Sequence, residues 1–168
     1  MYDNAFGDKK QLHFNWRSLP VAVADLVLVR RKQRAMNATI EAEKMIVAGD
    51  KSFVDAGSPT NSFATFFEDD GDTGYFYAVE RKASDLSIRD ALHVYNVASV
   101  PERNRPRCLT IVWSRDGLKS ALLLDGLAQA IFDFAAKRGY RRSGCPPPSS
   151  HWPDAGHQWN DAAMELFA

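Results

Sequence analysis

Residues 108–134 decide the fold and read CLTIVWSRDGLKSALLLDGLAQAIFDF. Three apolar segments follow one another in this stretch, separated first by the turn-forming residues 114–117 and then by 125–126. The second separator is Asp-Gly, which between apolar segments is the strongest short-range signal for a β-hairpin. We therefore expect a three-stranded antiparallel meander, whose alternating side chains bury one face in a core.

Further strands are expected upstream of this meander. Aromatic and apolar residues fill 63–67 and 75–79, and the acidic, glycine-containing sequence between them is typical of a turn, so these segments predict a hairpin. Residues 91–98 alternate as a strand does. The following connection, 101–107, is rich in proline and arginine and is too charged to be buried.

The two ends of the chain have different patterns. Residues 1–45 are expected to be an N-terminal extension; Ala35 to Lys44 favours a helix, whereas the valines of 21–29 equally suit a strand. Near the C-terminus, apolar residues recur with the spacing of one helical face. These residues are Trp159, Ala162, Ala163, Leu166 and Phe167.

These patterns predict an α+β fold. We expect a single domain over residues 46–168, built on an antiparallel β-meander sheet of about five or six strands. A C-terminal helix is expected to pack on one face of that sheet. The N-terminal extension could add a second helix.

Composition limits the classes of function. The chain has 168 residues, 45% hydrophobic, and 21 basic residues balance 21 acidic ones, so it lacks the overall positive field typical of nucleic-acid or membrane-surface binding. Two cysteines are too few for a disulfide framework. No apolar run is long enough to span a membrane, and none has the layout of a signal peptide. We expect a cytoplasmic protein.

Charge is nevertheless distributed unevenly along the chain. Residues 51–80 hold one base and six acids, whereas residues 81–120 hold eight bases and four acids. The acids concentrate at the predicted hairpin turn, beside two tyrosines, and acidic and aromatic residues together are typical of a surface that binds a basic protein. The candidate binding residues are Glu68, Asp69, Asp70, Asp72, Tyr75 and Tyr77.

Several of these segments resemble a bacterial family of unknown function, DUF2251, over residues 58–168. The resemblance rests on FFEDDGDTGYFYA at 66–78, ALHVYNV at 91–97, IVWS at 111–114 and shorter matches further on. It implies a small, soluble bacterial protein. It implies no chemistry for any residue.

An enzymatic alternative stays open at this stage. His93, or the pair His151 and His157 with Asp161, could act with an acidic residue near Asp70 in metal-assisted hydrolysis. Their spacing matches no known metal or catalytic motif, and the common nucleotide-binding and hydrolase signatures are absent from the sequence. The sequence therefore does not decide whether the protein is an enzyme, although it favours one without catalytic activity, and we expect no metal and no cofactor.

A second alternative is binding of RNA or single-stranded DNA by an arginine-rich surface. The residues concerned are Arg103, Arg105, Arg107, Arg138, Arg141 and Arg142, with Tyr140. The neutral net charge disfavours this alternative. The sequence thus favours a protein-binding module, with immunity against a bacterial toxin as its most specific form and a regulatory adaptor as an equivalent one.

Overall fold

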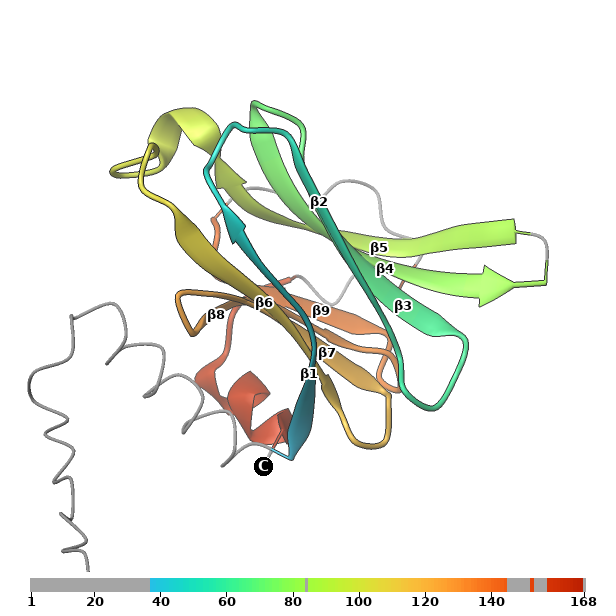
Figure 1. The fold of residues 1–168 in the computed structure, drawn as a ribbon. Helices are drawn as coiled ribbons and strands as arrows, with labels where there is room; N and C mark the ends of the chain where they lie inside the picture. The colour runs from blue at the N-terminus through green and yellow to red at the C-terminus, as the bar shows by residue number, and fades with distance from the viewer. Residues whose placement is uncertain (1–36, 84, 145–151, 153–156, 168) are drawn as a thin grey trace, which may run out of the picture.

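The fold is known from a computed structural model, which describes residues 37–83, 85–144, 152 and 157–167. The strands in this part of the chain form two antiparallel sheets, with the orders β1-β6-β7-β8-β9 and β2-β3-β4-β5 (Figure 1). Their bounds are β1 Ala38–Ile46, β2 Ser52–Gly57, β3 Phe63–Asp69, β4 Thr73–Lys82, β5 Asp85–Asn96, β6 Arg107–Ser114, β7 Lys119–Leu124, β8 Leu127–Asp133 and β9 Arg138–Arg141.

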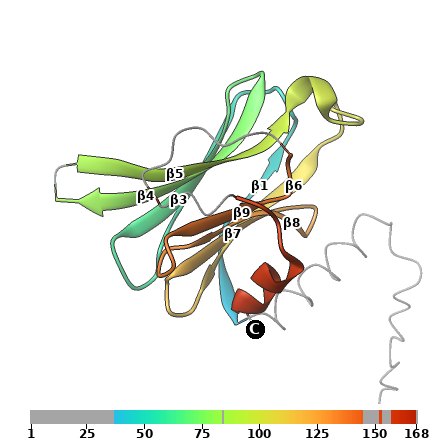
Figure 2. The same cartoon turned by 180° about the vertical axis from the view of Figure 1, so that it is seen from behind.

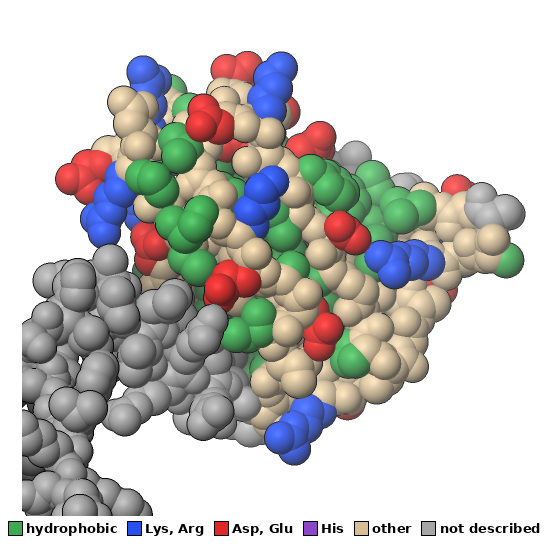
Figure 3. Space-filling model, in the orientation of Figure 1, with side chains coloured by type: hydrophobic (Ala, Val, Ile, Leu, Met, Phe, Trp, Pro, Cys, Tyr) green, Lys and Arg blue, Asp and Glu red, His purple; other side chains and the backbone are tan. Residues whose placement is uncertain are grey.

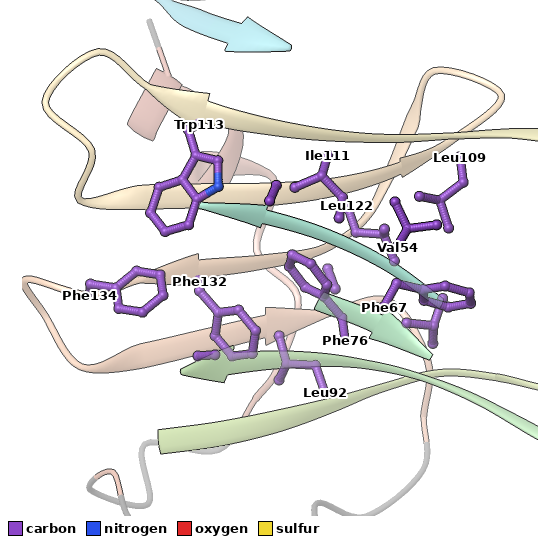
Figure 4. Packing of buried hydrophobic residues seen from close by; sticks show 14 of the residues in the cluster. Val54, Phe67, Phe76, Leu92, Leu109, Ile111, Trp113, Leu122, Phe132 and Phe134 are labelled. Carbon is purple, nitrogen blue, oxygen red and sulfur yellow. The ribbon is translucent and has the colours of Figure 1, made fainter. Parts of the chain in front are cut away.

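The two sheets pack face to face as a β-sandwich. Val54, Phe67 and Phe76 of the four-stranded sheet belong to the same buried cluster as Trp113 and Phe132 of the five-stranded sheet (Figure 4). The Phe76 and Phe132 rings stack at 5.2 Å across the interface. Burial of these large apolar side chains is the main stabilising contribution to the fold.

The predicted meander and the upstream hairpin are present. Strands β6, β7 and β8 pair in succession, and β3 pairs with β4 from Phe63 opposite Glu80 to Asp69 opposite Gly74. Gly74 is needed for a local reason: the Tyr95 ring of β5 lies 2.8 Å from the position that a Cβ atom would occupy there. Gly71 in the β3–β4 turn and Gly126 in the β7–β8 turn have positive φ, which is the turn chemistry that their sequences indicate.

The prediction of an α+β fold, with one meander sheet of five or six strands and a C-terminal helix on one face, was wrong. The described strands form two sheets, and each sheet covers the inner face of the other, so neither needs a helical layer. The C-terminal segment Asp161–Phe167 is a 3-10 helix of seven residues, η3, and no α-helix. It contributes Ala163 and Phe167 to a second apolar cluster on the outer side of the five-stranded sheet (Figure 2). The predicted helical face is not formed: Ala163 and Phe167 are buried, whereas Ala162 is exposed and Trp159 lies before η3. A segment of seven residues gains little from the cooperativity that stabilises an α-helix.

The helix-forming residues near 38–46 form strand β1 instead. This strand pairs with β6 from Ala38 opposite Ser114 to Ile46 opposite Arg107, so long-range pairing overrides local helix propensity. The expected boundary at residue 45 falls inside β1. The rest of the expected extension, residues 1–36, lies outside the described residues.

Candidate functional site

A row of aromatic side chains crosses the outer face of the four-stranded sheet. Phe53 of β2 lies 5.2 Å from Phe66 of β3, ring centroid to ring centroid, and Phe66 stacks on Tyr77 of β4 at 4.5 Å. Tyr75 follows at 5.9 Å from Tyr77. We call these four residues the aromatic row.

The alternation of side chains along the strands explains this row. Val54, Phe67 and Phe76 point into the core, so their neighbours Phe53, Phe66, Tyr75 and Tyr77 point outward. Phe53 is 54% exposed, and the other three rings are partly exposed. In Figure 3 hydrophobic side chains gather at the upper right of the molecule, where the four-stranded sheet lies.

Carboxylates lie within and beside the aromatic row. Glu68 is exposed and, by register, stands between Phe53 on β2 and Tyr75 on β4. Asp55, also exposed, forms an ion pair with Arg81 at 3.7 Å. A shallow groove of about 310 Å³ lies at this edge of the sheet, lined by Lys51, Ser52, Phe53, Glu68, Asp69 and Asp70.

Burial and the negative charge of this surface change the pKa of Tyr77. Partial burial raises the pKa of the Tyr77 hydroxyl, and the negative charge of Glu68 raises it further. The hydroxyl is therefore protonated at neutral pH and can donate a hydrogen bond to a ligand.

Asp69 has a structural position and is not part of the exposed surface. Asp69 is only 2% exposed. Its carboxylate accepts hydrogen bonds from the Gly49 N–H, the Gly71 N–H and the Tyr95 hydroxyl, each at 2.8 Å. Burial and this bond to Asp69 raise the pKa of Tyr95 above its usual range. Asp69 thus joins the β1–β2 connection, the β3–β4 turn and β5.

Asp70 and Asp72 are exposed at the turn, but they differ in their bonding. The Asp70 carboxylate accepts hydrogen bonds from the backbone N–H groups of Asp72 at 2.9 Å and Thr73 at 2.8 Å, which hold the turn and lower the pKa of Asp70. Asp70 therefore fixes the loop that presents Asp72. Asp70 lines the groove and adds negative charge beside the aromatic row.

The described histidine and aspartate residues of the enzymatic alternative bond to different partners and do not form one site. His93 is 4% exposed; its Nδ1 lies 3.2 Å from the Ser143 hydroxyl and its Nε2 lies 3.0 Å from the Asn96 side-chain oxygen. Its ring also meets the edge of Tyr75 at 5.2 Å. His93 is the cross-strand neighbour of Tyr75 and therefore packs against the end of the aromatic row from the side, on strand β5.

His157 has a partner that the sequence did not indicate. Its Nε2 lies 2.8 Å from the buried carboxylate of Asp90 on β5, which ties the C-terminal segment to the sheet edge. Asp161 accepts a hydrogen bond from the Trp159 indole N–H at 2.8 Å, and His151 lies outside the described residues. Within the described ranges, no three His, Cys, Asp or Glu side chains gather as a metal site requires.

The arginines of the nucleic-acid alternative lie in two separate groups. Arg107 is on β6 and Arg138 to Arg142 are on or next to β9, with β7 and β8 between them in the sheet. Arg107 pairs with Asp125 at 3.3 Å, and Arg142 lies over the Trp159 ring at 4.0 Å. Arg141 is buried.

Sequence reasoning missed Phe53 and Phe66 as members of the candidate surface. Phe66 alternates with the buried Phe67, a signal that could have placed it outward beside Tyr77. For Phe53 the segment SFVDA at 52–56 alternates in the same way, but it was not assigned as a strand.

The described residues define an antiparallel β-sandwich that carries an aromatic and acidic outer face. A family model described as an uncharacterized protein conserved in bacteria, DUF2251, matches residues 46–168, and the chain belongs to this family. A relative from Haemophilus influenzae, itself named only as an uncharacterized protein, is 36% identical over 132 residues, which cover 79% of this chain and 81% of the relative. No solved structure matches the chain.

The resemblance to DUF2251 is thereby confirmed, over a range that begins at residue 46 and not 58. None of the described helices has the length and apolarity needed to cross a membrane. These comparisons assign no activity to any residue.

Proposed function

We propose that this protein binds another protein of basic character through the aromatic row and the carboxylates beside it. The observation that carries this proposal is the unbroken series of ring contacts from Phe53 through Phe66 and Tyr77 to Tyr75, all on one outer sheet face. Rigid aromatic rings provide large contact areas at a low cost in side-chain entropy, and tyrosine is enriched among the residues that dominate binding energy.

The charge around the row favours a basic partner. Four exposed carboxylates lie on this sheet or in its β3–β4 turn: Asp55, Glu68, Asp70 and Asp72. Among the described residues, the cations beside the row include Lys51, which lines the groove, Arg81, which pairs with Asp55, and Lys44, whose Nζ donates to the Phe53 carbonyl. Lysine or arginine side chains of a partner would gain both carboxylate contacts and contacts with the faces of the tyrosine rings.

An immunity role is the narrower form of this proposal. A toxin that acts on nucleic acid needs a basic cleft, and a surface that combines carboxylates with aromatic rings would complement such a cleft. A regulatory adaptor would use the same surface. The cytoplasmic setting of either role stays a prediction.

Affinity capture with matched surface variants tests the proposal. Phe53→Ala is the main variant, and Met45→Ala is its control, because Met45 is 59% exposed but lies on β1 of the other sheet. Partners captured from the native bacterium should be lost with Phe53→Ala and with Tyr77→Ala, and retained with Met45→Ala. Loss of a residue that dominates binding weakens a complex by about thirtyfold.

A charge-specific variant completes the test. Glu68→Gln keeps the size of the side chain and removes its charge, so it should lower affinity most at low salt. If all of these variants retain the same partners with the same salt dependence, the aromatic row is not the binding surface and the proposal fails.

A further inference from the structure

Strand β2 lies at an edge of the four-stranded sheet. Within the described residues it pairs with β3 on one side, and no strand pairs with its other side. An edge strand presents backbone N–H and C=O groups in the direction of its open side, where an extended segment of another chain can bond to them.

The register shows which residues of β2 face this open edge. The Ser58 N–H donates to the Phe63 carbonyl at 2.8 Å, so the residues at alternate positions before Ser58, namely Ala56 and Val54, bond to β3. Phe53, Asp55 and Gly57 then direct their backbone groups away from β3. In agreement, Lys44 Nζ reaches the Phe53 carbonyl from outside the sheet, at 3.4 Å.

The open edge of β2 continues the candidate binding face. Phe53 and Asp55 carry outward side chains and also edge-facing backbone groups. A strand added beside them would place every second side chain on the outer face, next to Phe53 and the groove that contains Glu68 and Asp70. These carboxylates select cationic side chains for those positions.

We infer that the basic partner of the proposed function docks an extended segment as an additional strand on β2, with lysine or arginine at alternate positions beside Phe53, at the β2 end of the aromatic row. This inference rests on the proposed function and specifies the partner's conformation. The main-chain bonds would supply affinity, and the alternating cationic side chains would supply specificity.

The test compares two substitutions at Asp55, using a synthetic peptide of alternating lysine and valine as the probe. Asp55→Ala removes the carboxylate only, whereas Asp55→Pro also removes the edge-facing N–H and leaves the β2–β3 hydrogen bonds in place. We expect the proline variant to bind the peptide about tenfold more weakly than the alanine variant. Thermal unfolding of both variants checks that the sheet is retained.

Amide hydrogen exchange of the unmodified protein gives a second measurement that needs no variant. The amides of Phe53, Asp55 and Gly57 should become protected when the lysine–valine peptide is added. A matched glutamate–valine peptide should give neither binding nor protection.

The outcomes separate the two proposals. If the peptide binds in a Tyr77-dependent manner but equally to both Asp55 variants, without protection of the edge amides, strand addition is overturned and the proposed function stands. If the unmodified protein does not prefer the lysine peptide to the glutamate peptide, the proposed function is overturned together with the inference.

Discussion

Replacement of Asp69 should lower the free energy of unfolding, whereas replacement of its exposed neighbour Glu68 should not. The Asp69→Ala variant leaves three hydrogen-bond donors without their acceptor: the Gly49 N–H, the Gly71 N–H and the Tyr95 hydroxyl. A hydrogen bond to a charged group contributes about 1.5–3 kcal/mol, and water can reach the partly buried donors, so we take about 1 kcal/mol for each.

The expected loss is therefore about 3 kcal/mol in the free energy of unfolding, which for a domain of this size lowers Tm by about 12 °C. Differential scanning calorimetry of the two variants is the assay. Glu68→Ala is the matched control; its side chain is exposed, and its loss should change Tm by no more than about 2 °C. Equal melting temperatures for the two variants would refute the anchoring role of Asp69.

Three further predictions concern groups elsewhere in the fold. The raised pKa of Tyr95 stabilises the folded protein fully below the unfolded tyrosine pKa of about 10, and this contribution is lost as the pH rises toward the folded value. Between about pH 9 and pH 11, the melting temperature should therefore fall less for Tyr95→Phe than for the unmodified protein. His157→Ala should cost about 3 kcal/mol, because it leaves the Asp90 carboxylate buried without its histidine partner, and urea unfolding measures this cost. Phe132→Ala should cost about 3–5 kcal/mol through the cavity between the sheets, whereas an unchanged urea midpoint would place Phe132 outside the core.

Local sequence patterns were sufficient for the elements that are formed by neighbours in the chain. The Asp125-Gly126 turn and the acidic turn between β3 and β4 each join strands that pair directly, so alternation and turn chemistry specify them. The separation into two sheets was not accessible in this way. It depends on the pairing of β1 with β6, in which Ala38 stands opposite Ser114, and no local pattern specifies such a distant partner.

The candidate surface was accessible from the sequence only in part. The tyrosines at 75 and 77 and the exposed acids were chosen from their composition, and the structure places them on or beside one face. Composition alone cannot distinguish Asp69 from Glu68. The Asp69 carboxylate is buried because Tyr95 and the loop at Gly49 pack against it in the tertiary structure, whereas Glu68 stays in solvent. The partnership of His157 with Asp90 is likewise a long-range contact.

The most direct measurement of the central claim is a binding footprint at single-residue resolution. Amide resonances of the isotope-labelled protein are recorded before and after the captured partner is added. We predict that the changes concentrate on Phe53, Phe66, Glu68, Tyr75 and Tyr77, on the outer face of the four-stranded sheet. A footprint on the five-stranded sheet or around η3, with these five residues unchanged, would contradict the assignment of the aromatic row as the binding surface.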